Sequence, residues 1–290
     1  MKNQQYAQFA HNVYSQFGED GIIEQLLAKL PSKDGWCVEF GAWDGIHLSN
    51  TFNLIKNMAY RSVLIEANAK KFKVLQKNLT PFGAVLVNEF VTFEGDNTLD
   101  KILERTPIPK DFDFLSIDID GNDFWIFDSL LEFRPKLICI EYNPSIPNDV
   151  EYIQPRDFSV QKGSSALSIY NLAKQKGYEL VVTTPCNLLL VSKEYFDCYH
   201  INDNSLNTLR DDADCRVYAF VGYDGTIIHS KPIHFFWHNF ITSEYELQVL
   251  PKYLRRFASD YNLIQKIFFS IFMLLREPKR TLRHAYTKLR

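Results

Sequence analysis

Acidic side chains end two apolar segments of this chain, at positions from which they could act together on one substrate. Asp118, Asp120 and Asp123 follow one segment, and Glu141 ends the next. Carboxylates held close together are costly unless a proton, a cation or hydrogen-bond donors compensate their charge. Such a group can accept a proton from a hydroxyl as a general base, or it can bind a hard divalent cation.

We predict that this acidic group carries the chemistry of the protein. The predicted proton acceptors are Asp118, Asp120 and Glu141. The same residues, together with Asn122, are the predicted ligands of Mg²⁺ or Mn²⁺. A second interpretation stays open, in which Asp120 and Asn122 form a turn and Asp123 caps the helix that follows.

A glycine-containing turn marks a candidate nucleotide site. The apolar segment 37–40 runs into the turn 41–45, and a second apolar segment, 62–66, ends on Glu66. Doubly wound sheets hold an adenosyl group in this way, because glycine lets the backbone approach the ligand and the acid accepts two ribose hydroxyls. The predicted cofactor-binding residues are Gln16, Glu39, Phe40, Gly41, Ala42, Asp44, Gly45, Glu66, Ala67 and Asn68.

Charges in and beside this turn indicate which nucleoside cofactor it binds. A dinucleotide site aims backbone N–H groups at a pyrophosphate, which Glu39 and Asp44 would repel. The same carboxylates tolerate a sulfonium cation with an amino-acid tail. The turn therefore favours S-adenosylmethionine, although the turn by itself could also be a plain connection in an α/β core.

Histidine offers another base. His47 comes soon after the turn at Gly45 and is added to the predicted catalytic residues. His234 and His238 stand four residues apart, a spacing that can bind a metal on a helix. Their aromatic neighbours 235–237 favour ordinary packing instead.

The order of strand-like and helical segments predicts the fold that positions these residues. Strand-like segments recur at 37–40, 62–66, 84–91, 112–118 and 137–142, and helical patterns lie at 20–30, 70–78, 98–105, 123–133 and 163–176. A closing pair of strands follows at 178–184 and 188–191. Alternating strands and helices predict an α/β fold with a doubly wound, Rossmann-like and mostly parallel sheet. Its ligand crevice lies at the carboxyl ends of the strands, so the acidic group should lie beside the cofactor.

Composition narrows the class of protein. Of the 290 residues 46% are hydrophobic, which is ample for a core, and the five cysteines show no paired CxxC spacing. The N-terminal segment has no apolar run after its lysine, and no eighteen uninterrupted apolar residues occur. We therefore expect a globular, cytoplasmic protein that neither carries a signal peptide nor spans a membrane.

The C-terminal segment 251–290 differs in charge from the rest. It holds ten Lys or Arg against two acids, a balance of +8, whereas the first 250 residues carry −11. Its apolar run 267–275 has basic flanks and suits peripheral association with the inner leaflet of a membrane. Docking on the domain, or on a second subunit in a homodimer, is the alternative. Because the body is acidic, we expect no nucleic-acid partner.

Several of these motifs together resemble a known family. The segment 14–22, the turn after Glu39, the segment 115–123 and the segment 140–143 are similar to the FkbM-type branch of class I S-adenosylmethionine-dependent methyltransferases. The resemblance covers about residues 12–196. It implies a seven-stranded sheet and O-methylation of a hydroxyl, often on a sugar, and some related sugar methyltransferases use Mg²⁺.

These observations lead to one prediction with two rivals. Residues 1–196 form the S-adenosylmethionine-binding domain, 197–250 a substrate or cover region, and 251–290 a helical tail. The predicted activity is O-methylation of a carbohydrate or glycolipid hydroxyl, with a divalent metal as an assisting group. A nucleotide-dependent oxidoreductase and a non-catalytic Rossmann-like binding module are the alternatives.

Overall fold

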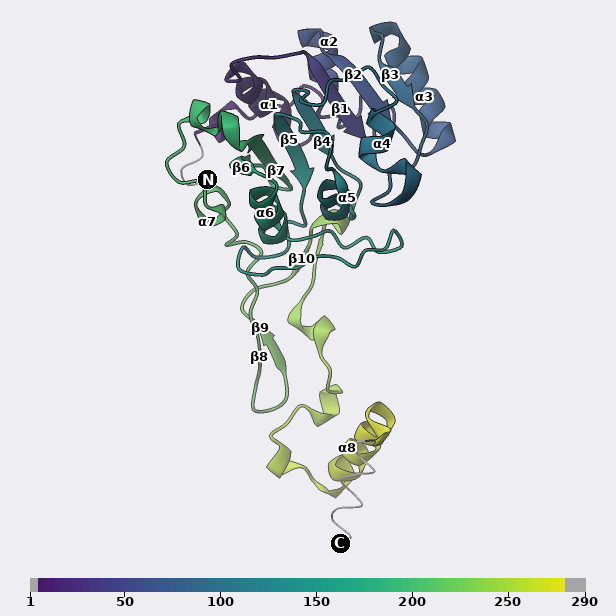
Figure 1. The fold of residues 1–290 in the computed structure, drawn as a ribbon. Coiled ribbons are helices and arrows are strands. Elements are labelled where there is room, and N and C mark those ends of the chain that lie inside the picture. The colour runs from purple at the N-terminus through teal and green to yellow at the C-terminus, as the bar shows by residue number, and fades with distance from the viewer. Residues whose placement is uncertain (1–4, 280–290) are drawn as a thin grey trace. The chain divides into compact units, whose positions relative to one another are not determined.

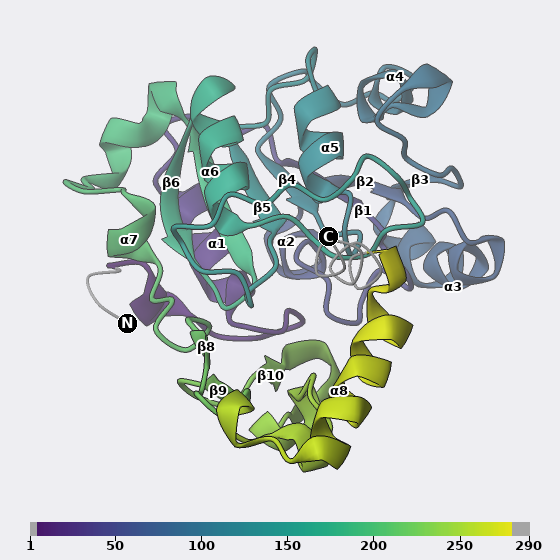
Figure 2. The ribbon, with the colours of Figure 1, turned by 90° about the horizontal axis from the view of Figure 1, so that it is seen from below.

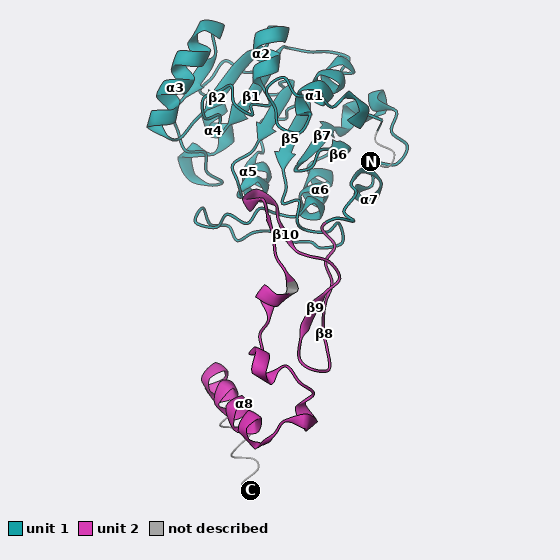
Figure 3. Cartoon of the chain, turned by 180° about the vertical axis from the view of Figure 1, so that it is seen from behind, with its two compact units in different colours: residues 1–214 teal, residues 215–290 magenta. Residues whose placement is uncertain are grey.

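The chain forms two compact units, residues 1–214 and 215–290, in a computed structural model that describes residues 5–279 (Figure 3). The first unit extends beyond the predicted boundary at residue 196. The reason is apolar packing, since Leu206 and Leu209 of the short helix α7 (Leu206–Leu209) are buried in the core of the first unit.

A seven-stranded sheet forms the centre of the first unit (Figure 1). Its strands are β1 (Trp36–Phe40), β2 (Arg61–Ile65), β3 (Val85–Val87), β4 (Phe114–Ile117), β5 (Leu137–Glu141), β6 (Tyr178–Thr183) and β7 (Asn187–Ser192). They lie in the order β3-β2-β1-β4-β5-β7-β6, with β1 to β5 parallel and β7 antiparallel to both of its neighbours. The predicted doubly wound, mostly parallel sheet is confirmed.

Helices cover both faces of this sheet (Figure 2). They are α1 (Glu19–Ala28), α2 (Phe52–Met58), α3 (Ala69–Leu79), α4 (Leu99–Leu103), α5 (Asp123–Ser129) and α6 (Ala166–Gln175). Each face has its own apolar cluster, one with α1, α2 and α3 and the other with α4, α5 and α6. Neighbouring residues of β1 divide between them, Cys37 on one face and Val38 on the other, because successive strand side chains point to opposite faces.

Short 3₁₀ turns connect or extend these elements. They are η1 (Ala7–Phe9), η2 (Thr80–Phe82), η3 (Gly95–Asn97) and η4 (Lys193–Tyr199) in the first unit, and η5 (Phe236–His238), η6 (Glu244–Leu247), η7 (Lys252–Leu254) and η8 (Ala258–Asp260) in the second. The helix α2 has no counterpart among the predicted segments, because it is only seven residues long and lacks a side-chain N-cap.

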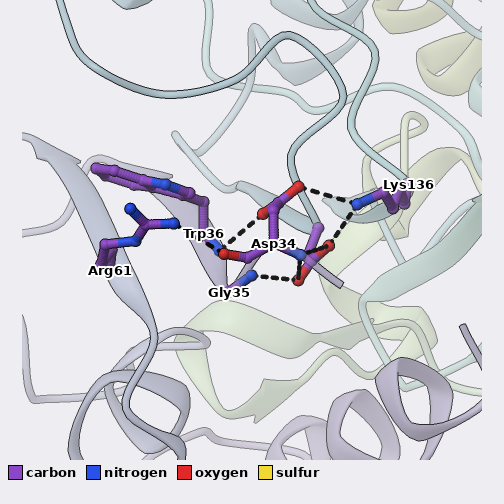
Figure 4. A network of polar contacts seen from close by, with 6 residues as sticks. Asp34, Gly35, Trp36, Arg61 and Lys136 are labelled. Atoms are coloured by element: carbon purple, nitrogen blue, oxygen red, sulfur yellow. Dashed lines mark hydrogen bonds and ion pairs between the residues drawn. The ribbon is translucent and has the colours of Figure 1, made fainter. Parts of the chain in front are cut away.

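A buried ionic network ties the sheet together where β1, β4 and β5 begin (Figure 4). The Lys136 ammonium donates to Asp113 at 2.7 Å and to Asp34 at 2.9 Å. Asp113, whose side chain has no exposed surface, also accepts the Gly35 N–H at 2.8 Å. Burial alone would lower the pKa of Lys136, but its hydrogen bonds to the two carboxylates raise it above the usual value. The network therefore joins one ammonium group to two carboxylates, and each of these charges would be costly to bury without a partner.

The second unit consists of small elements and one longer helix. Two short hairpins pair β8 (Ala219–Val221) with β9 (Ile227–His229) and β10 (His234–Phe235) with β11 (Phe240–Ile241). The helix α8 (Leu263–Arg276) contains the apolar run noted in the sequence. Because His234 lies in β10 and His238 in η5, the two histidines do not share a helix, and each ring packs on a phenylalanine. Across residues 5–279, every helix is too short or too polar to cross a bilayer.

Candidate active site

The carboxyl ends of four neighbouring strands bring the two predicted constellations together. Phe40 of β1 pairs with Ile65 of β2 and with Ile117 of β4, so Gly41, Glu66 and Asp118 follow these strands at one edge of the sheet. Gly41 has a φ of +71°, and a Cβ there would lie 2.7 Å from the carbonyl oxygen of Asp118. The close approach requires glycine and places the cofactor turn directly beside the acidic group.

Three carboxyl groups form the acidic cluster at this edge. Ligand atoms of Asp118, Asp123 and Glu141 all lie within 4.8 Å of one another. Burial, followed by repulsion from Asp118 and the other acids, raises the pKa of Glu141 to about 11. The same causes, with Asp123 the strongest neighbour, raise the pKa of Asp118 to about 7. At neutral pH Glu141 is therefore protonated and shares a hydrogen bond with Asp118.

The membership of this cluster differs from the predicted metal set. Asp123 replaces Asp120 and Asn122, because α5 begins at Asp123 and turns its carboxylate back toward the strand end. Its two oxygens accept the Ile119 and Gly121 N–H groups, each at 2.9 Å. Burial still raises its pKa to about 6.

The other two residues of the predicted set shape the connecting turn. Asp120 has a φ of +57° and is exposed, and the buried side chain of Asn122 donates to the carbonyl of Asp157 at 3.3 Å. Their positions correspond to the alternative interpretation, in which these residues form a turn. Asp123 accepts two N–H groups of this turn and also belongs to the cluster. The sequence interpretation treated these two roles as alternatives.

The donor set of the cluster fits a hard divalent cation. Its ligand atoms are carboxylate oxygens, the atom type that Mg²⁺ and Mn²⁺ prefer. Asp118 keeps solvent-exposed surface although its surroundings desolvate the carboxyl group, so a route for an ion or a substrate remains. Burial and then mutual repulsion keep the pKa values of Asp118 and Glu141 high, and a cation would compensate the repulsion.

Glu66, the residue predicted to bind the ribose hydroxyls, has a hydrogen-bond partner on each carboxylate oxygen. Its carboxylate accepts the Trp43 N–H at 2.9 Å on one oxygen and the Asn68 N–H at 2.7 Å on the other. The side chain is buried, so these two bonds fix its orientation at the end of β2. Each oxygen keeps a further lone pair, which matches a pair of adjacent hydroxyls.

Replacing Glu66 by Gln should weaken binding of S-adenosylhomocysteine about 10- to 100-fold, the value of a lost hydrogen bond to a charged group. Titration calorimetry measures the change, and Glu94→Gln, at an exposed acid, serves as the matched control. Unchanged affinity in a folded Glu66→Gln protein would remove Glu66 from the cofactor site.

Glu39 has internal partners. Its carboxylate accepts the hydroxyls of Ser49 at 2.6 Å and Thr51 at 2.7 Å, and the Asn50 N–H at 3.0 Å. Burial raises its pKa, and these three donors act in the opposite direction. Glu39 therefore organises the segment 49–51, and a direct cofactor contact stays a prediction.

The structure assigns internal roles to other residues of the predicted cofactor turn. A Cβ on Gly45 would lie 2.3 Å from Leu79 and 2.6 Å from Leu75, so packing of α3 requires glycine there, and a contact of Gly45 with the cofactor stays a prediction. Asn68 is the N-cap of α3 and accepts two backbone N–H groups. Asp44 accepts the Ile46 and His47 N–H groups, at 2.9 and 2.8 Å.

The remaining predicted residues divide between the surface and the core. Gln16, Gly41, Ala67 and His47 are exposed, whereas Phe40 and Ala42 are buried in the core. The His47 ring packs edge-on against Trp43, with ring centroids 5.4 Å apart. His47 does not belong to the acidic cluster.

Two buried residues that the sequence interpretation missed lie opposite Glu141 or hold the segment that follows it. Asn187 of β7 lies opposite Glu141 and donates to Glu19 at 3.1 Å. Arg210 donates to the Tyr142 hydroxyl at 3.1 Å and to the carbonyl of Pro144 at 2.8 Å, which fixes the segment after Glu141. Glu19 was visible as part of the motif at 14–22, but no local signal links Arg210 to residues 142–148.

The strand order, with β7 antiparallel between β5 and β6, completes a mostly parallel, doubly wound sheet. Residues 94–180, which contain β4, β5 and the whole acidic cluster, match the family model of the methyltransferase FkbM domain. The match confirms the resemblance and the predicted enzyme class, an S-adenosylmethionine-dependent methyltransferase. No curated protein matches the chain in sequence.

The solved structures that are similar to this chain include the following three. A S-adenosylmethionine-dependent methyltransferase from Aquifex aeolicus is 13% identical, with a TM-score of 0.35 over 59% of this chain and 89% of that one. TrmK of M. capricolum, in complex with S-adenosylhomocysteine, is 13% identical, with a TM-score of 0.34 over 59% and 67%. The N-terminal domain of EvdMO1, with S-adenosylhomocysteine bound, is 13% identical, with a TM-score of 0.38 over 66% and 82%.

Proposed function

We propose that the protein transfers the methyl group of S-adenosylmethionine to a hydroxyl of a carbohydrate or glycan precursor. The observation that carries this proposal is the placement of Asp118 and Glu141, whose carboxyl oxygens lie within 4.8 Å of each other beside the turn at Gly41. A pair of this kind suits an acceptor that must lose a proton, as a hydroxyl does. The cytoplasmic location inferred from the dispersed cysteines is part of the same proposal.

The reaction is an in-line displacement at the sulfonium methyl. The acceptor oxygen forms a bond to the methyl carbon while the carbon–sulfur bond breaks. The electron pair of that bond stays on the sulfur, which becomes a neutral thioether. Holding the oxygen, carbon and sulfur collinear can contribute about 7–11 kcal/mol. The fixed carboxylate of Glu66 and the rigid turn at Gly41 would supply this positioning on the cofactor side.

Asp118 is the proposed acceptor of the hydroxyl proton. It is exposed, and with its pKa raised to about 7 it is a stronger base than an ordinary aspartate while still half ionised near neutral pH. Glu141 stays protonated and donates a hydrogen bond to Asp118, which holds the Asp118 carboxylate in place. The proton therefore ends on Asp118 and leaves to solvent.

A divalent cation such as Mg²⁺ or Mn²⁺, bound in place of the proton on Glu141, is the second route within this proposal. Asp118, Glu141 and Asp123 are the residues that would hold it. When bound, such an ion lowers the pKa of a coordinated hydroxyl.

A methyl-transfer assay tests the proposal. Purified protein with radiolabelled S-adenosylmethionine is offered a panel of sugars and sugar-lipids, with amino acids and small amines as controls. We expect label in an alkali-stable ether of a sugar, and loss of activity on chelation if the cation is required. Labelling of the amines alone, with all sugars inert, would contradict the proposed acceptor class.

A further inference from the structure

One face of the helix α8 is apolar and open to solvent. Seven side chains form this face, with exposures between 43% for Leu274 and 79% for Leu275. We call it the α8 face, and it consists of Leu263, Ile264, Ile267, Phe268, Ile271, Leu274 and Leu275. Soluble proteins seldom expose contiguous apolar patches without a partner for them.

The geometry of the helix shows that these residues form one stripe. At about 100° per residue, the seven positions cover an arc of about 140° without a polar residue between them. The opposite side is held by neighbours in the second unit. Gln265 is buried and donates to the Tyr253 carbonyl at 3.1 Å, and the Phe269 ring packs on Tyr261 at 5.8 Å. These contacts orient the helix and leave the α8 face outward.

The length and charge of this region indicate what covers the face. Fourteen helical residues span about 21 Å, less than the roughly 30 Å of a bilayer core, so α8 can lie on a membrane but not cross it. Lys266 and Arg276 flank the apolar arc, one on each side, where their long side chains can reach lipid headgroups. Basic residues also surround the helix in sequence, at Lys252, Arg255, Arg256, Lys279, Arg280, Arg283, Lys288 and Arg290.

We propose that the α8 face docks on the surface of an anionic membrane. The apolar stripe would enter the headgroup boundary while the flanking cations contact anionic lipids. A second copy of the chain fits less well, because two segments with a net charge of +8 repel each other. This inference uses only residues of the second unit and does not depend on the proposed methyl transfer.

Sedimentation of the full chain with lipid vesicles tests this. Vesicles of equal parts phosphatidylcholine and phosphatidylserine should bind the protein, with binding weakened by salt, and vesicles of phosphatidylcholine alone should bind it much less. The double variant I267E/I271E should lower the partition coefficient at least about 100-fold, because it removes two apolar side chains from the stripe. R276Q/K279Q should lower it about 10-fold or more.

Matched variants distinguish the effect of losing the apolar stripe from the general effect of added negative charge. Ile271→Leu keeps the surface apolar and should bind as the original protein does. Ser259→Glu adds the same charge as Ile271→Glu at an exposed position outside the helix, and it should reduce binding far less. All these positions are exposed, so the variants should unfold at the same temperature as the original protein.

Three outcomes would overturn the proposal. The first is a wild-type protein that does not sediment with the anionic vesicles. The second is equal, salt-independent binding to both vesicle types. The third is a dimer by light scattering that I267E/I271E converts to a monomer, without vesicle binding, which would assign the α8 face to a second copy.

Discussion

Replacing Asp118 by Asn should lower kcat for methyl transfer about 10²- to 10⁴-fold, the range for loss of a general base. Asn has nearly the same shape but cannot accept the hydroxyl proton as a carboxylate does. Affinity for S-adenosylhomocysteine should stay unchanged, because the proposed cofactor contacts lie at Glu66 and at the turn at Gly41. Initial rates with a labelled methyl donor, together with calorimetric titration, measure the two effects separately.

Asp120→Asn is the matched control for this experiment. Asp120 is exposed, lies outside the acidic cluster, and has a φ of +57° that Asn tolerates well. Its rate should therefore stay close to that of the original protein. Equal losses in the two variants would mean that Asp118 has no special part in the chemistry.

The pH profile gives a second readout of the same prediction. Because the pKa of Asp118 is raised to about 7, the residue is protonated and inactive as a base below that pH. The rate should rise with pH through about 7 and then level off, and Asp118→Asn should lose this rise. A flat profile across neutral pH in the original protein would contradict the assignment of Asp118 as base.

Glu141→Gln separates the two roles proposed for the cluster. Glutamine resembles the protonated Glu141 that its high pKa implies, so it keeps the hydrogen-bond donor to Asp118. If the pair works through the shared proton, this variant retains activity and a chelator has no effect. A loss as large as that of Asp118→Asn, with chelator sensitivity, identifies the pair as cation ligands.

Lys136→Met should destabilise the first unit by about 3–5 kcal/mol, the cost of leaving a buried charge without its partner. The methionine fills the volume of the lysine stem but cannot pair with Asp113, whose side chain has no exposed surface. Urea unfolding followed by circular dichroism measures the loss in free energy of unfolding. The network lies at the beginnings of the strands, away from the acidic cluster, so cofactor affinity in the folded protein should not change.

A surface pair supplies the control for Lys136. Lys110 and Glu132 also lie 2.9 Å apart, but their side chains are 61% and 59% exposed, and Lys110→Met should cause no measurable loss. Adding Asp113→Asn to Lys136→Met should recover part of the stability, because it removes the unpaired charge. Equal stability of the Lys136 and Lys110 variants would show that the buried network does not matter for folding.

Much of the fold follows from local patterns in the sequence. Every predicted strand of the sheet is present, because runs of apolar residues that are buried on both faces differ clearly from the helices between them. The helix α2 was missed, since it has seven residues and no side-chain cap to mark its start. The position of Asp118 and Glu141 at strand ends was also a sequence prediction, and the parallel register places both at one edge.

The sequence by itself determined the class of fold and the edge of the sheet where chemistry could occur, because both depend on short-range periodicity and strand order. The tertiary structure alone decided which acids meet. Asp123 joins Asp118 and Glu141, while Asp120 is not a member of the cluster, because these positions depend on a positive φ and on where α5 begins. The tertiary structure alone also shows that packing of α3 requires glycine at position 45, because contacts between distant elements leave no local pattern in the sequence.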